Sequence, residues 1–220
     1  MKISKHLVAT AMLVASVSAS ASAGAQVWGQ KAAGPLGSFL ALSGPGACFP
    51  FSCTLGGTVG SIMGGTVYAS DQGFADIPAG SIFGPRFLAA GPSSGPIPST
   101  LTFSGAGVKD IGFLWGSPDL RNSLRVYFTP PDFGVDYLDF TPSILLFAET
   151  EGAQNFSQYV SFTAENGFLI TKLEFTNVVD VDAFEAANFS TSVIPEPATY
   201  ALMATGLVAL GLVSKRRKQV

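Results

Sequence analysis

Glycine and proline interrupt the first half of this 220-residue chain so often that a long helix cannot form there. Seven pairs made of these two residues lie between positions 34 and 96: Gly34-Pro35, Gly44-Pro45, Gly56-Gly57, Gly64-Gly65, Gly84-Pro85, Gly91-Pro92 and Gly95-Pro96. Glycine accepts the backbone angles of tight turns and proline lacks a backbone N–H, so each pair marks a turn. The segments 58–63, 66–69 and 101–103 lie between or just after these pairs, and their composition predicts short strands.

The second half of the chain shows the alternation that is typical of half-buried antiparallel strands. Along 124–128, leucine, valine and phenylalanine alternate with arginine and tyrosine, which places the apolar side chains on one face. The same period recurs at 160–163 and 172–175, and 108–115, Ile144–Ala148 and 183–189 are further strand candidates. Eight to ten short strands without an amphipathic helix predict an all-β fold, an antiparallel β-sandwich of jelly-roll-like type. Most of the 18 phenylalanines would fill its core.

An apolar segment followed by a basic cluster lies near the C-terminus. Ala198–Val213 contains no charged side chain, and Lys215, Arg216, Arg217 and Lys218 follow it. As a helix the segment would be about 24 Å long, close to the shortest length that spans a bilayer. The pattern predicts a single transmembrane helix with the basic cluster in the cytoplasm. The alternative is a buried helix of a soluble domain, but such a helix needs a polar face that this segment lacks.

The N-terminal residues have the pattern of a secretory signal peptide. Lys2 and Lys5 precede the apolar run 7–17, and small residues then form overlapping Ala-x-Ala sites up to Ala25. This order predicts export through the Sec translocon and cleavage after Ala23 or Ala25. A transmembrane anchor is the alternative, although the apolar run is short for one.

The tripeptide Pro195-Glu196-Pro197, the apolar segment and the basic cluster occur in the order that resembles a PEP-CTERM sorting signal. The resemblance implies recognition of this tripeptide by exosortase, a membrane-embedded enzyme, with 215–218 as the orienting charge. It also implies cleavage there, release or transfer to the cell surface, and a Gram-negative host with an exopolysaccharide or biofilm matrix. The chain then divides into a signal peptide at 1–25, a β-sandwich at 26–192 and a sorting signal at 193–220. The sandwich is flanked by an N-terminal signal helix and a C-terminal single transmembrane helix.

The charge of the predicted domain excludes one class of function. Residues 26–192 hold 14 of the 15 acidic residues and only six of the 12 basic ones, so their net charge is −8. A domain without a basic stripe is not expected to bind nucleic acid. The single histidine, His6, belongs to the signal peptide, which removes Ser-His-Asp and Cys-His catalysis and histidine-based metal sites from the domain.

Cys48 and Cys53 are the only cysteines of the chain. In an exported protein two cysteines this close are expected to form a disulfide, worth about 2 kcal/mol because the loop is small. A redox-active pair is the alternative, but the spacing is not C-x-x-C and no basic residue lies nearby.

Trp115-Gly116-Ser117-Pro118-Asp119, followed by Asn122, is the most distinctive motif of the domain. One interpretation makes Trp115 a stacking platform for a sugar, with Asp119 and Asn122 as hydrogen-bonding partners. The other places Trp115 in the core and gives Asp119 and Asn122 the role of capping the next turn. The segment resembles F-x-W-G-S-x-D-x-x-N-x-L of one group of exosortase-dependent surface proteins, whose closing F-E-x-D/A-N segment corresponds to 184–188. Ala187 stands where many members of that group have aspartate.

Acidic residues cluster at two places, Asp132, Asp136 and Asp139 in the first and Asp180 and Asp182 in the second. Solvated loops, a calcium site and the acid pair of a glycosidase are the three interpretations. No cofactor or catalytic residue is otherwise indicated. We therefore expect a non-enzymatic exported surface or extracellular-matrix protein, anchored first in the inner membrane. The alternatives are a module that binds extracellular polysaccharide and a carboxylate-based glycosidase.

Overall fold

The protein is an antiparallel β-sandwich in the computed structural model, which describes residues 27–129, 137–178 and 182–192. One sheet of the described part has eight strands, in the order β1 (Val27–Lys31), β12 (Ser157–Ala164), β9 (Asp110–Gly116), β14 (Phe184–Thr191), β7 (Phe87–Ala90), β6 (Thr66–Tyr68) and β3 (Gly46–Ala47), with β2 (Ser38–Phe39) paired to β14. The other has six, in the order β11 (Tyr137–Phe140), β10 (Ser123–Phe128), β13 (Ile170–Thr176), β8 (Ser99–Phe103), β5 (Gly60–Met63) and β4 (Cys53–Leu55). A short 3₁₀ helix, η1, spans Pro92–Ser94.

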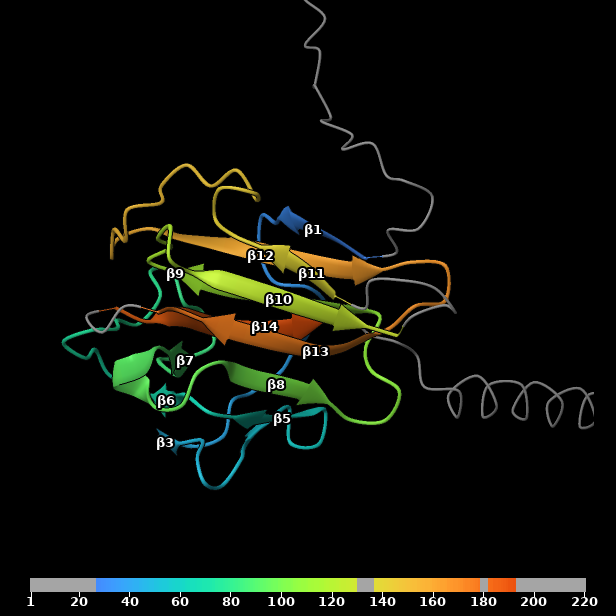
Figure 1. Cartoon of the computed structure of the whole chain (residues 1–220), viewed down its shortest axis with the longest axis horizontal. Helices are drawn as coiled ribbons and strands as arrows, with labels where there is room; N and C mark the ends of the chain where they lie inside the picture. The colour runs from blue at the N-terminus through green and yellow to red at the C-terminus, as the bar shows by residue number, and fades with distance from the viewer. Residues whose placement is uncertain (1–26, 130–136, 179–181, 193–220) are drawn as a thin grey trace, which may run out of the picture.

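The two sheets stack face to face (Figure 1). The core between them is rich in aromatic rings. Phe113 of β9 lies at its centre, with its ring centroid 5.6 Å from that of Phe175 in the opposite sheet and 5.5 Å from that of Phe189. Phe140 and Phe162 make a second contact between the sheets, at 4.9 Å. Edge-on and tilted ring pairs at these distances suit the aromatic quadrupole, so the phenylalanines lock the two layers together.

The eight-stranded sheet is covered on its outer face as well. Residues 69–86, which we call the cover segment, pass over β14 and β7, and Ala75 packs there against Phe87, Ala89 and Ala187. All four residues are fully buried. Because β9 and β7 are buried along their whole length and β14 along all but its last residue, these strands lie in the interior of the molecule.

A bulge in β14 sets which side chains reach each face. The register against β9 shifts between Ala187 and Ser190, where Asn188 has φ of +51°. One extra residue in a strand turns the following side chains to the opposite face. Phe184, Ala186 and Phe189 therefore reach the core between the sheets, while Glu185 and Asn188 reach the cover segment.

The all-β antiparallel prediction is confirmed, and the strands at 124–128, 160–163 and 172–175 are found within β10, β12 and β13. The expected number of strands was too low, since the described residues hold 14, several of them only two or three residues long. The jelly-roll-like connection stays a prediction. The signal helix at 1–25 and the transmembrane helix at 198–213 lie outside the described residues, and within the described ranges no helix is long and apolar enough to cross a bilayer.

The predicted strand Ile144–Ala148 is wrong. Thr141 and Pro142 accept backbone bonds from Leu145 and Phe147, so the segment folds as local turns. Its side chains do alternate, because Leu145 and Phe147 are buried while Ile144 is 59% exposed. Alternating burial without a neighbouring strand to pair with does not make a strand.

Phe113→Ala is expected to lower the free energy of unfolding by about 3–5 kcal/mol, because it leaves a cavity among five aromatic neighbours. Denaturant unfolding of the purified protein measures this. Val178→Ala, at an exposed position, is the control and should change stability by less than about 0.5 kcal/mol. Equal effects of the two substitutions would contradict the central role of Phe113.

Candidate functional site

The structure buries the tryptophan motif. Trp115 has no exposed surface, its ring stacks on Phe184 at 4.1 Å, and its indole Nε1 donates to Asn122 Oδ1 at 2.9 Å. Asp119 Oδ1 accepts from the backbone N–H groups of Arg121 and Asn122, and Oδ2 accepts from Asn177. A ring without exposed surface offers no platform for a sugar in this structure. Asp119 and Asn122 instead hold the turn that follows β9.

Gly116 of the same motif allows a close approach of the cover segment. A Cβ at this position would lie 2.8 Å from Pro78 Cγ and 2.7 Å from Glu185 Oε2. Contacts under 3 Å do not occur for real Cβ atoms, so a larger residue would push Pro78 away from β9. The glycine therefore serves the packing of the outer face.

Glu185 and Asn188, the two polar members of the closing motif, hold the cover segment in place. Glu185 Oε1 accepts from the backbone N–H of Asp76 at 2.7 Å. Asn188 Oδ1 accepts from Ser81 Oγ at 3.0 Å and from the backbone N–H of Phe83 at 3.2 Å, and its Nδ2 donates to Tyr159 Oη at 2.7 Å. Both side chains are almost fully buried, which makes each of these bonds costly to lose.

The environment of Glu185 changes its acidity. Burial raises the pKa of this carboxyl to about 7, and the amide of Asp76 opposes part of the effect by donating to the ionised form. Burial also raises the pKa of Asp119, against the two backbone N–H groups that it accepts from. The cause of both pKa shifts is structural, because the loops that pack over the two carboxyl groups bury them.

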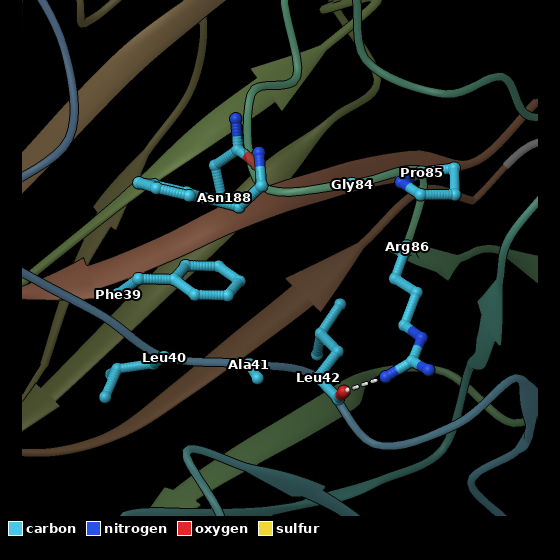
Figure 2. Close-up of a pocket in the computed structure, with 9 residues that line it drawn as sticks. Phe39, Leu40, Ala41, Leu42, Gly84, Pro85, Arg86 and Asn188 are labelled. Carbon is cyan, nitrogen blue, oxygen red and sulfur yellow. Dashed lines mark hydrogen bonds between the residues drawn. The ribbon is translucent and has the colours of Figure 1, made fainter.

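A hollow of about 270 Å³ opens beside the cover segment and is lined by two stacked aromatic rings and an arginine (Figure 2). Phe39 and Phe83 lie with their centroids 4.2 Å apart and are 40% and 39% exposed. The Arg86 guanidinium donates to the carbonyl of Leu42 at 3.1 Å and forms no ion pair with any acidic side chain of the described residues. Sequence reasoning missed this group. Its one signal was that Arg86 is the only basic residue between Lys31 and Lys109.

The clustered acids are only partly described. Asp132, Asp136 and Asp180 lie outside the described residues. Asp139 pairs with Arg125 at 2.7 Å, and Asp182 lies 3.4 Å from Arg121. Within residues 27–129, 137–178 and 182–192 no three acidic, histidine or cysteine side chains gather as a metal site. Calcium binding stays a prediction.

A second hollow, of about 290 Å³, contains two acidic residues, Asp119 and Glu151. Their backbones form an isolated antiparallel bridge. The Asp119 carboxylate is already engaged by two backbone amides and Asn177, so it faces the protein. The glycosidase interpretation stays a prediction.

Cys48 and Cys53 form a disulfide, with Cα atoms 5.0 Å apart. The bridge closes a loop between β3 and β4, which form neighbouring outer edges of the two sheets. Phe49 and Phe51 of this loop are exposed. The bond therefore joins the two ends of an exposed loop.

Comparison with known proteins identifies the C-terminal segment. The family model described as PEP-CTERM protein-sorting motif matches residues 193–218, which contain Pro195, Glu196, Pro197 and Lys215 to Lys218. No curated protein and no solved structure matches the chain. The predicted sorting signal is thus confirmed, and it indicates an exported protein that is sorted by exosortase. The motif residues lie outside the described part of the chain, whose last residue is Ser192.

Glu185→Gln is expected to remove a pH dependence of stability. The folded carboxyl keeps its proton up to about pH 7, whereas the unfolded chain releases it near 4.5, so its contribution is fully present below 4.5 and is lost as pH rises through 7. The full loss is about 3 kcal/mol. Glutamine keeps the acceptor for Asp76 but cannot ionise. The variant should match the wild type at pH 4.5 and exceed it in stability at pH 7.5, as measured by denaturant unfolding; parallel stability curves would contradict this assignment.

Proposed function

We propose that the protein is a non-enzymatic surface or extracellular-matrix protein whose folded domain is delivered by its sorting signal. The match at 193–218 carries the proposal. The Sec translocon exports the chain, the apolar segment 198–213 holds the precursor in the inner membrane, and exosortase processes it at the Pro-Glu-Pro tripeptide. If the product is released, water supplies a hydroxyl to the new carboxyl terminus and a proton to the new amine. If it is transferred, an acceptor nucleophile takes the place of water.

The polar residues of the two motifs bond within the domain, and this supports a non-enzymatic role. Trp115, Asp119 and Asn122 bond to one another or to nearby backbone, and Glu185 and Asn188 bond to the cover segment. The disulfide is consistent with an oxidising compartment outside the cytoplasm. These groups therefore serve to stabilise the fold.

Removal of the sorting elements tests the proposal. Glu196→Ala, or deletion of Lys215 to Lys218, should leave the full-length precursor in the membrane fraction, because recognition or orientation is lost. Fractionation and intact-mass analysis of the exporting cells measure this. Glu165→Ala, which removes an exposed acid of the domain, is the matched control and should be processed normally. Unchanged size and location of the two sorting variants would contradict the proposal.

The hollow beside the cover segment favours a second candidate function, binding of an acidic polysaccharide. Phe39 and Phe83 offer apolar ring surface to the face of a sugar. Arg86 keeps donors that no acid of the described residues occupies, and a guanidinium binds a carboxylate with two parallel hydrogen bonds. An arginine that forms no ion pair with an acid of the described residues, beside two aromatic rings, suits a carboxylate-bearing sugar better than a neutral one.

Binding to a polyuronate and to a neutral dextran tests this second function. The full chain without its apolar segment should bind the polyuronate more tightly, and Arg86→Gln should weaken that binding about tenfold or more because charge-assisted bonds are lost. Phe51→Ala, at an exposed ring outside the hollow, is the control and should bind normally. Equal binding of wild type and Arg86→Gln would contradict the assignment to this hollow.

A further inference from the structure

Asp110 holds the last described residues of the chain. Its side-chain Oδ1 accepts from the backbone N–H of Ser192 at 2.6 Å and from Thr191 Oγ1 at 3.1 Å, and Oδ2 accepts from Ser192 Oγ. Thr191 Oγ1 shares its single proton between Oδ1 and the backbone carbonyl of Asp110, which lies 2.8 Å away. Asp110 is 93% buried, since only 7% of it is exposed, and we call this set of bonds the Asp110 clamp.

The clamp acts at the end of a strand that is held on both sides. Ser190 pairs with Gly112 of β9 and with Phe39 of β2, and Thr191 pairs with Ser38. Ser190 Oγ also accepts from the backbone N–H of Leu36 at 2.9 Å. The segment up to Ser190 is therefore secured by strand pairing and core packing. Thr191 is held by its pair with Ser38 and by Asp110, and Ser192 depends largely on Asp110.

The distance along the chain from the clamp to the sorting tripeptide is short. Only Val193 and Ile194 separate Ser192 from Pro195. Three residue steps span at most about 11 Å, even when the chain is fully extended. While the clamp is closed, the folded domain must stay within this distance of the tripeptide.

An enzyme that cleaves beside the tripeptide must hold several residues of the substrate in an extended groove, as peptide-recognition sites do. A sheet of eight strands cannot enter such a groove. Opening the clamp, together with the terminal Thr191–Ser38 pair, frees Thr191 and Ser192. The linker between Ser190 and Pro195 then has four residues instead of the two that follow Ser192. The added length moves the domain away from the enzyme.

We propose that the Asp110 clamp limits the rate of sorting, by holding the folded domain so close to Pro195-Glu196-Pro197 that exosortase gains full access only when Thr191 and Ser192 detach. The inference rests on the proposed processing at this tripeptide. Asp110 is thus a positioning residue for processing, and it acts through the length of the linker. Its own side chain takes no part in cleavage.

The experiment follows conversion of the full-length precursor to the mature protein by pulse–chase in cells that contain exosortase. Asp110→Ala should shorten the half-time on the order of tenfold, because several hydrogen bonds that hold the strand end are lost. Insertion of Gly-Ser-Gly-Ser between Ser192 and Val193 leaves every described contact in place and should accelerate processing to a similar extent. With the insertion present, Asp110→Ala should have no further effect, since the linker is already long.

Ile62→Val controls for general destabilisation. It trims a fully buried side chain of β5, in the other sheet, and should leave the half-time unchanged. Unchanged half-times for both Asp110→Ala and the insertion, in cells that process the wild type, would overturn the proposed role of the clamp and leave the proposed function standing. An additive effect of Asp110→Ala on top of the insertion would also overturn it, since linker length would then not be the cause. Failure to process either the wild type or the insertion variant would overturn the proposed function as well.

Discussion

Strand β14 is buried on both faces, and the remaining architecture depends on how its side chains are divided between them. On the inner face, Phe184 and Phe189 join the aromatic cluster that connects the two sheets. On the outer face, Glu185 and Asn188 bind the backbone of the cover segment. A strand with two different faces cannot slip by one residue, because slippage would bring a carboxylate into the aromatic core. The bulge at Asn188 fixes this register.

The need to give buried polar groups a hydrogen-bond partner therefore explains the residues of the two motifs better than ligand contacts do. An indole N–H or an amide left without a partner in the interior costs about 1–3 kcal/mol, so Trp115 requires Asn122, and the amide of Asp76 requires Glu185. The conformation of the turn after β9 and the position of the cover segment both follow from these bonds. Burial of the carboxyl groups then raises the pKa of Glu185 and of Asp119 as a consequence of packing.

The sequence predicted those strands whose two faces differ in polarity. Along β10, alternation of leucine, valine and phenylalanine with arginine and tyrosine matches the alternating burial of the strand. β7 is buried on both faces and reads as an uninterrupted apolar run, and β2 and β3 have only two residues each, so period-two reasoning finds none of them. Ile144–Ala148 is the opposite case, because its side chains alternate although the segment is not a strand. It is a turn whose Phe147 ring packs against Trp115.

The candidate sites also divide into one that the sequence predicts and others that only the folded structure brings together. The sorting signal was readable because its elements are contiguous in sequence, and the hollow was not, because Phe39 and Arg86 meet only after β2 and the cover segment pack together. The role of Glu185 was hidden for the same reason, since its partner Asp76 lies 109 residues away along the chain.

The position of β14 also places the end of the folded domain next to the sorting signal along the chain. β14 ends at Thr191, and the match to the sorting motif begins at residue 193. The pairs of β14 with β9 and with β2 involve residues up to Thr191, and cleavage at the tripeptide leaves these residues in the domain. Asp110 is thus the point at which the described fold meets the segment that leads to the signal.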